Sequence, residues 1–458
     1  MFATYLDGGD GAVMTKLVGG IALDSTGKVY VATDTTSTQL PVTPGAFQPA
    51  YGGGLTDGLL AKYDPTGVLL YLSYFGINAK VTVSGIALDS SGTAYISGAT
   101  SAPAPSGFPA QNALQAAYGG GNFDAFVFSV NPAGAGAADL NYATLLGGSD
   151  SDQALAIAAD SANPPNTYVT GLTRSTNFPT GGNVGALNAK SAGGNDAFLS
   201  VLSAGAGGTL QLSCSTYLGG SQDDAGTAIA FVSPAAVYVV GKTASQNFPV
   251  LGSLQTFSGV GDVFLAKFDI TIPGSASLVY STLLGGTTFD EPHALAADAS
   301  GGLYVAGVAH SSDYPVSAHP SNGFQLACSN CGSATGANDA FLTKLVENLP
   351  PTPILSFSAA SLNFGLVPVG TSSNPQHVNL FNSGTAALNV ISTTITGANP
   401  GDFAILPSGS ACPAPAFFNC PRERNVRSLF SSHLRWGHQR PLQSTLMTIL
   451  QAVPNPCR

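Results

Sequence analysis

Carboxylates recur just after glycine pairs, at the ends of several similar segments. They are Asp150 and Asp152, Asp223 and Asp224, and Asp290 and Glu291. Carboxylates in turns can bind Ca²⁺, which takes about six to eight oxygen ligands. The structural alternative is that they cap turns by accepting hydrogen bonds from backbone N–H groups. Since no spacing here supplies a full ligand set, we expect no cofactor or metal and keep these residues as weak calcium candidates.

A second group of aspartates opens a segment of the type Asp-Ala-Phe. Its members are Asp57, Asp124, Asp196, Asp262 and Asp339. A catalytic residue rarely appears in every copy of a repeat, whereas a capping role would recur with the backbone that it serves. We therefore predict that these aspartates are structural.

Histidine offers one candidate acid–base cluster, because His293 follows Asp290 and Glu291 and imidazole titrates near neutral pH. A histidine in a turn is the alternative that we favour. Several Arg side chains would be needed to hold a carboxylate substrate, as in sialidases, but residues 1–346 contain only Arg174. No G-x-S-x-G, H-E-x-x-H or P-loop sequence occurs. We predict no catalytic residue and no enzyme activity.

Cys328 and Cys331 form a Cys-Ser-Asn-Cys sequence in a predicted loop. One such pair is too small for a four-ligand zinc site, and no βαβ pattern surrounds it to suggest a redox motif. We predict a small loop disulfide, which suits an exported protein.

Two long loops carry a tyrosine followed by glycines, at Tyr51–Gly54 and Tyr118–Gly121. Such loops on a rigid scaffold could bind a glycan or a protein. The alternative is that they are spacers.

The elements that carry these residues are internal repeats. Four segment types recur in the same order five times, and the Asp-Ala-Phe aspartates are 66 to 77 residues apart. One of the other three types begins at Phe2, Leu70, Leu140, Leu212 and Leu278. A second type begins at Gly20, Gly85, Ala156, Ala228 and Ala294. The third type contains Tyr30, Tyr95, Tyr168, Tyr238 and Tyr304. Apolar and β-branched residues make each segment a predicted strand. An Asp-x-x-Gly turn, as at Asp24–Gly27, joins two of them into a hairpin.

Four strands per repeat predict an all-β fold, a β-propeller of five four-stranded repeats. A solenoid is the alternative, but solenoid repeats are shorter. We expect the strand that begins at Gly20 to be innermost and the strand of the Leu70 type to be outermost. The last copy then ends after its third strand, and Phe2–Asp7 would supply the fourth and close the ring.

Residues 1–346 resemble the bacterial seven-bladed β-propeller (SBBP) repeat family. The resemblance rests on Ser215–Gly220, on the Asp-x-x-Gly-x-x-Tyr-Val turn, on the Asp-Ala-Phe strand and on Phe-Pro pairs such as Phe178-Pro179. It implies an exported or surface-associated propeller. The N-terminal residues show no signal peptide and match the middle of a repeat. We therefore expect two further repeats and a signal peptide upstream, and an extracellular or cell-surface location.

The rest of the chain divides into a Pro-rich linker at 347–353, a partial Ig-like β-sandwich at 354–411 and an atypical tail at 412–458. Residues 354–411 resemble the abnormal-spindle/hydin (ASH) type of Ig-like domain through Leu362–Gly365, Leu380–Gly384 and Asp402-Phe403. In the tail the strand pattern stops and Arg becomes frequent. We expect a frameshifted or disordered tail; a basic membrane or nucleic-acid patch is the alternative.

Composition limits the partners. The net charge is −10 and charged residues make up 9%, so no basic stripe is available for nucleic acid. No run of apolar residues is long enough to insert into a membrane. We expect a monomeric, non-enzymatic, exported bacterial propeller that acts as a cell-surface scaffold or binding module for an extracellular glycan or protein. The alternative is a metal-dependent propeller enzyme of lyase or lactonase type, with its site in the central channel.

Overall fold

The structure is a computed structural model, and it divides the chain into two compact units, Met1–Val346 and Glu347–Arg458. In the first unit it describes residues 3–346 except 5, 7, 11–18, 77, 102–107, 183–186, 189, 206–208, 272–276, 299–300, 317–327, 329–330 and 332–337. In the second unit it describes six short strands and a few residues between them. The unit boundary falls where the sequence repeats end.

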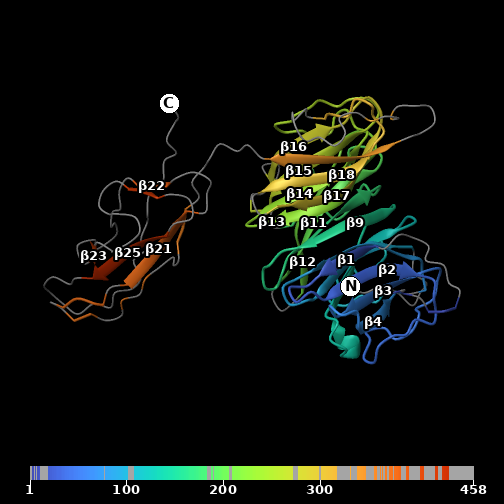
Figure 1. The fold of residues 1–458 in the computed structure, drawn as a ribbon, viewed down its shortest axis with the longest axis horizontal. Helices are drawn as coiled ribbons and strands as arrows, with labels where there is room; N and C mark the ends of the chain where they lie inside the picture. The colour runs from blue at the N-terminus through green and yellow to red at the C-terminus, as the bar shows by residue number, and fades with distance from the viewer. Residues whose placement is uncertain are drawn as a thin grey trace. The chain divides into compact units, whose positions relative to one another are not determined.

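The first unit is built from antiparallel sheets, as the repeats predict (Figure 1). The first sheet contains β1 (Gly20–Leu23), β2 (Val29–Thr35), β3 (Asp57–Tyr63) and β4 (Leu69–Phe75). The second contains β5 (Val81–Leu88), β6 (Ala94–Thr100), β7 (Asp124–Val130) and β8 (Leu140–Leu146), and a 3-10 helix, η1 (Gly136–Asp139), precedes β8. The third contains β9 (Asp152–Ala159), β10 (Thr167–Thr173), β11 (Asp196–Ala204) and β12 (Leu210–Leu218). The fourth contains β13 (Asp224–Val232), β14 (Ala236–Thr243), β15 (Asp262–Asp269) and β16 (Leu278–Leu284). The fifth contains β17 (Asp290–Ala297), β18 (Gly302–Ala309) and β19 (Asp339–Val346).

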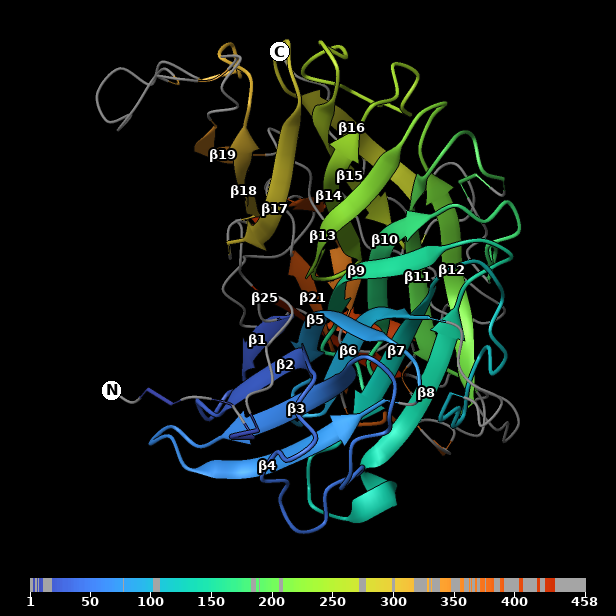
Figure 2. The same cartoon turned by 90° about the vertical axis from the view of Figure 1, so that its right-hand side faces the viewer.

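Strands within each of these sheets follow chain order, so each sheet is a meander. The first strands pack on one another in succession, β1 on β5, β5 on β9, β9 on β13 and β13 on β17 (Figure 2). The strand order predicted from the repeats is therefore confirmed, and so is the all-β class.

The predicted hairpin turn joins the first two strands. Asp24 Oδ1 accepts hydrogen bonds from the backbone N–H groups of Thr26 and Lys28, and Gly27 adopts a positive φ of 81°. The other oxygen of the turn aspartate accepts a hydrogen bond from the tyrosine of the second strand. In the hairpin of the third sheet, the Tyr168 hydroxyl donates to Asp160 Oδ2 at 2.8 Å. This bond explains why the repeat pairs an aspartate turn with a tyrosine.

Apolar clusters fill the four spaces between successive sheets. The second-strand tyrosines belong to them: Tyr30 packs between the first two sheets, Tyr95 between the second and third, Tyr168 between the third and fourth, and Tyr238 between the last two. A fifth cluster, around Leu59, lies on the outer side of the first sheet. Burial of these side chains is the main force that holds each sheet on the next.

The two ends of the series differ from its middle. The fifth sheet has three strands among the described residues, and β17 does not pack on β1 as the other first strands pack on one another (Figure 2). Of the predicted closing strand Phe2–Asp7, the residues Phe2, Tyr5 and Asp7 lie outside the described part of the chain. Ala3, Thr4 and Leu6 are described and are not in a strand, and Leu6 packs against the cluster on the first sheet.

The second unit also consists of strands. They are β20 (Leu355–Phe357), β21 (Gln376–Asn382), β22 (Leu388–Val390), β23 (Phe403–Leu406), β24 (Phe418–Cys420) and β25 (Asn425–Ser432). One sheet has the order β20-β21-β25-β23, and β22 pairs with β24. Two of these strands, β24 and β25, lie where we expected an atypical tail. Across the described residues of the whole chain, no helix has the length and apolar character needed to cross a membrane.

Candidate functional site at the junctions between sheets

The candidate acids gather where the outermost strand of one sheet leads into the first strand of the next. Asp152 opens β9 and is fully buried. Its Oδ2 accepts hydrogen bonds from the backbone N–H of Gly148 at 2.7 Å and from the Ser175 hydroxyl at 2.8 Å. The carboxylate therefore fastens the glycine pair of the junction to the loop that follows the second strand.

The same arrangement occurs at the next two junctions. Asp224 Oδ2 accepts from the Gly220 N–H at 2.7 Å and from the Ser245 hydroxyl at 2.9 Å. Asp290 Oδ2 accepts from the Gly286 N–H at 2.9 Å, and the Ser311 hydroxyl donates to it at 2.8 Å.

The Asp-Ala-Phe aspartates fasten the other side of each junction. Their Oδ2 atoms accept from backbone N–H groups four or five residues earlier: Asp124 from Gly119 at 2.6 Å, Asp196 from Ala192 at 3.0 Å and Asp262 from Ser258 at 2.8 Å. Asp57 accepts in the same way from Gly52. These bonds have the capping character that we predicted for this group.

The two kinds of aspartate meet at the first glycine of the pair. A methyl group at Gly147 would lie 2.6 Å from Asp124 Oδ1 and 2.9 Å from Asp152 Oδ2. At Gly219, the corresponding distances to Asp196 Oδ1 and Asp224 Oδ2 are 2.3 and 2.7 Å. Glycine is required here because any side chain would displace one of the two carboxylates.

Burial raises the pKa of these carboxyl groups. The pKa of Asp57, Asp224 and Asp262 rises to about 6 because burial removes water from the charged form. The pKa of Asp124 rises to about 7, mainly through burial and further through the negative charge of Asp152.

In six of the buried junction carboxyl groups the Oδ1 atom accepts no hydrogen bond from the described part of the chain: Asp57, Asp124, Asp152, Asp196, Asp224 and Asp262. Asp290 differs, because both of its oxygens accept hydrogen bonds. A buried oxygen without a donor disfavours the charged form of the carboxyl group, in agreement with the raised pKa of Asp124.

The members of two calcium-candidate pairs separate in the structure. Asp150 and Asp223 are exposed, whereas their neighbours Asp152 and Asp224 are fully buried. Asp223 Oδ1 accepts from the backbone and side-chain amides of Asn195, at 2.8 and 2.9 Å. Because the two side chains point to different surroundings, each pair serves two separate loops.

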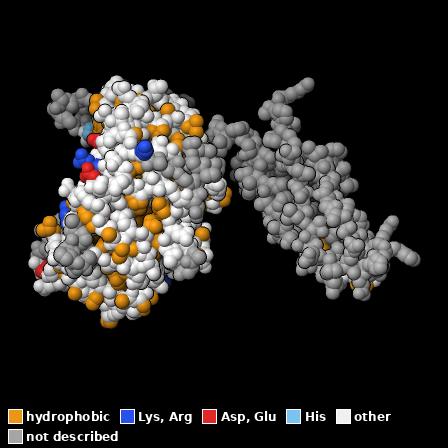
Figure 3. All heavy atoms as spheres, turned by 180° about the vertical axis from the view of Figure 1, so that it is seen from behind, with side chains coloured by type: hydrophobic (Ala, Val, Ile, Leu, Met, Phe, Trp, Pro, Cys, Tyr) orange, Lys and Arg blue, Asp and Glu red, His pale blue; other side chains and the backbone are white. Residues whose placement is uncertain are grey.

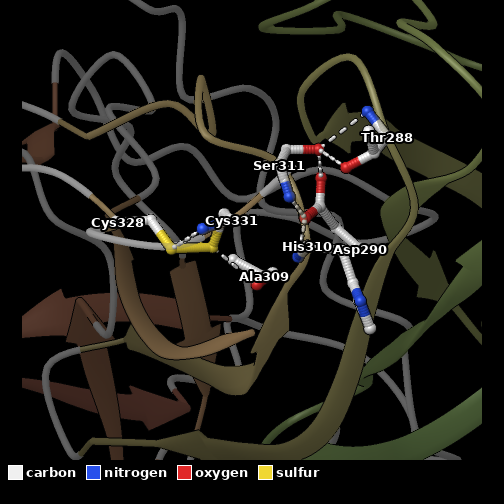
Figure 4. The surroundings of a disulfide bond; sticks show 7 residues. All are labelled: Thr288, Asp290, Ala309, His310, Ser311, Cys328 and Cys331. Atoms are coloured by element: carbon white, nitrogen blue, oxygen red, sulfur yellow. Dashed lines mark hydrogen bonds between the residues drawn. A yellow bond between two sulfur atoms is a disulfide. The ribbon is translucent and has the colours of Figure 1, made fainter. Parts of the chain in front are cut away.

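The third pair and its histidine separate in a similar way. Asp290 Oδ1 accepts from the backbone N–H groups of His310 and Ser311, at 3.0 and 3.2 Å (Figure 4). Glu291 forms an ion pair with Lys242 at 2.7 Å. His293 is exposed on β17. The two acids are therefore engaged with different partners rather than with the imidazole.

Cys328 and Cys331 are joined by a disulfide, with 5.5 Å between their Cα atoms (Figure 4). With Asp339 they form the one group of three potential metal ligands found among the described residues. The disulfide uses both sulfur atoms, so no thiolate is left there to bind a metal. Cys214 is buried and is not part of a disulfide.

The tyrosines of the glycine-rich loops turn inward. The hydroxyl of Tyr51 donates to the Gly54 carbonyl oxygen at 3.3 Å, and that of Tyr118 donates to the Gly121 carbonyl oxygen at 3.2 Å. The Tyr51 ring also packs edge-on against Tyr74. These tyrosines stiffen their loops instead of presenting a binding surface.

A cavity of about 190 Å³ lies between the second and third sheets. It is lined by polar, apolar and tyrosine side chains, among them Tyr95, Tyr142 and Thr167, and by no carboxylate or histidine. Pockets for small-molecule ligands are usually larger, at about 300–1,000 Å³.

Two features escaped the sequence analysis. The junction serines Ser175 and Ser245 belong to a Ser-x-Asn-Phe-Pro sequence, of which only the Phe-Pro was noticed. The exposed apolar side chains of the long loops were also missed, and they are Leu55, Val250, Leu251, Leu254, Val260 and Val316. The Ser-x-Asn spacing could have revealed the first; exposure within a loop leaves no sequence signal.

Comparison of the sequence with protein-family models gave no match, and no curated protein matched it.

Proposed function

We propose that the chain is a non-enzymatic β-propeller of the SBBP repeat kind, exported and acting as a scaffold or binding module at the cell surface. The observation that carries this proposal is the use of the repeated buried carboxylates. At each junction described above they receive backbone N–H and serine hydroxyl donors, so their chemistry anchors loops. A series of meander sheets whose buried carboxylates hold the connecting loops in place is a rigid support for those loops.

In this proposal the sheets of the series are the blades of the propeller. Successive packing of the first strands on one another supports blades around a common axis. Residues 354–411 with their short strands are proposed as a partial Ig-like domain of the ASH type. The antiparallel sheet of that unit supports a β domain, and it also includes β25 from the region after residue 411. The disulfide at Cys328 supports export, because disulfides persist in oxidising compartments.

The proposed binding surface is the loop between β14 and β15. Its apolar side chains Val250, Leu251, Leu254 and Val260 are exposed. Charged side chains are few on the face of the repeat unit seen in Figure 3, and hydrophobic ones form several patches there. Clustered exposed apolar side chains mark interaction sites. An extracellular glycan or protein is the proposed partner.

Binding of the full chain to immobilised extracellular polysaccharides and proteins tests the proposal. The variant with Leu251→Ser and Leu254→Ser should lose most of the binding seen with the unaltered chain. Val279→Ser, an exposed position on the outermost strand β16, is the matched control and should bind normally. Equal binding by both variants, or turnover of a lactone or polysaccharide that depends on a divalent metal, would refute the proposal.

A further inference from the structure

Two sheet faces at the ends of the series carry exposed apolar side chains on their end strands. On β1, Ile21 and Leu23 are 67% and 66% exposed. On β19, Leu342 and Val346 are 72% and 65% exposed. We call the side of the first sheet that carries Ile21 and Leu23 the leading face, and the side of the fifth sheet that carries Leu342 and Val346 the trailing face.

The repeats supply an internal comparison for the leading face. Ile21 lies opposite Val31 on β2, as Ile157 lies opposite Val169 and Ile229 lies opposite Val239. Where a preceding sheet is present the isoleucine is covered: Ile157 and Ile229 are both 8% exposed, and Ile86 of the second sheet is partly buried. The exposure of Ile21 therefore reflects the lack of a neighbouring sheet, because its own hairpin is the same.

The trailing face shows the same contrast. Leu342 is the third residue after the aspartate of its strand, a position that Leu60, Val127, Leu199 and Leu265 occupy in the other sheets. Those four side chains are at most 1% exposed, because each packs on the following sheet.

The two faces are complementary. In every space between sheets, the trailing position of one sheet and the leading position of the next belong to one cluster: Leu199 with Val239, and Leu265 with Val305, for example. Leu342 and Ile21 occupy these two positions at opposite ends of the series. Each face therefore has the partner surface of the other, on a molecule in which β17 does not pack on β1 as its neighbours do.

The strand count is complementary as well. Leu6 packs against the cluster on the outer side of the first sheet. Leu218 of the outermost strand β12 packs against the fourth sheet in the corresponding way. Thr4 and Leu6 stand in the sequence as Thr216 and Leu218 do. The segment with Leu6 therefore occupies the place that the outermost strand of a preceding sheet would take beside the leading face. A three-stranded sheet such as the fifth fits the rest of that face.

We propose that the chain associates head to tail, with the trailing face of one copy packed on the leading face of a second copy. The partner is a second copy because the surface that fits each face is present at the other end of the same series of sheets. The interface is heterologous, so it leaves one free face at each end and can extend beyond a dimer. This replaces the monomer that the sequence analysis expected, and it does not depend on the proposed binding function.

Sedimentation velocity of the full chain from nanomolar to high micromolar concentration tests the proposal. We expect dimers and longer species that increase with concentration. Ile21→Asp and Leu342→Asp should each raise the dissociation constant more than about tenfold, because an unpaired charge would be buried in an apolar interface. Leu254→Asp, at a loop position 64% exposed, is the control and should associate normally.

Mixing the two single variants gives the sharpest result. Each keeps one intact face, so the mixture should form a one-to-one dimer that does not extend further, whereas each variant alone stays monomeric. Unchanged thermal unfolding of both variants would show that the substitutions leave the fold intact. A monomeric unaltered chain at every concentration, association unaffected by both substitutions, or failure of the mixture to dimerise would each overturn the proposal.

Discussion

Asp124 and Asp152 approach the same glycine from two sides, each at the start of a strand and each out of contact with water. Their backbone donors hold the loops on either side, so the pair belongs to the framework. The cost of this arrangement is mainly the loss of water around the buried carboxylates, and the charge of Asp152 adds to it at Asp124. The raised pKa values follow from that cost and predict how stability responds to pH.

We expect the free energy of unfolding to rise on acidification between about pH 8 and pH 5. Asp57, Asp124, Asp224 and Asp262 have folded pKa values of about 6 to 7, above the value of an unfolded aspartate near 3.9. A group raised in this way stabilises the fold fully below the unfolded pKa, and the stabilisation is lost as the pH rises through the folded pKa. Each aspartate should contribute on the order of 1 kcal/mol over this window.

Urea unfolding at several pH values measures the slope. Asp124→Asn should flatten the slope near neutral pH, because it removes the group with the highest pKa of these four. Asp150→Asn, at an exposed position, is the control. A slope of zero or of opposite sign in the unaltered chain would contradict the assignment of these pKa values to burial.

Tyr168→Phe should lower the free energy of unfolding by about 1–3 kcal/mol, since it removes a hydrogen bond to a charged acceptor, Asp160. Tyr238 is a matched control, because Val232 stands in its hairpin where the aspartate stands in the others. Chemical denaturation of both Phe variants gives the comparison. An equal loss at the two positions would show that the turn aspartate adds nothing to the tyrosine contact.

At the scale of elements, the second strand is constrained by a bulge in the hairpins of the second to fifth sheets. The register between β13 and β14 shifts between Gly226 and Ala228, and this brings the Ala225 carbonyl oxygen over Gly241. The same close approach occurs at Gly171 and Gly307. The repeated glycine of the second strand is therefore set by a backbone contact.

Gly241→Ala should destabilise the fold by about 2–4 kcal/mol, because its methyl group would lie 2.0 Å from a backbone oxygen that cannot move without breaking the ladder. Thermal unfolding of this variant against Val279→Ala, an exposed change on β16, measures the effect. A loss no larger than that of the control would mean that the bulge relaxes freely.

At the scale of the whole molecule, the series of sheets is least supported at its two ends. Backbone amides of β1 and β19 should exchange hydrogen faster than those of β10 and β14, which have a sheet packed on each side. Hydrogen exchange with mass spectrometry measures this at low and high protein concentration. Head-to-tail association should protect β1 and β19 selectively at high concentration, while uniform exchange along the series would argue against weak ends.

The amino-acid sequence by itself determined the strands, their order and the end of the repeats near residue 346, because alternation, turn chemistry and repetition are local properties. It indicated a structural role for the Asp-Ala-Phe aspartates. Only the tertiary structure decided that Asp152 is buried while Asp150 is exposed, since Asp152 opens β9 whereas Asp150 lies in the turn before it, and the sequence does not show where the strand begins. It also decided that Ile21 and Ile157, alike in their hairpins, differ in exposure, because burial depends on whether another sheet lies alongside.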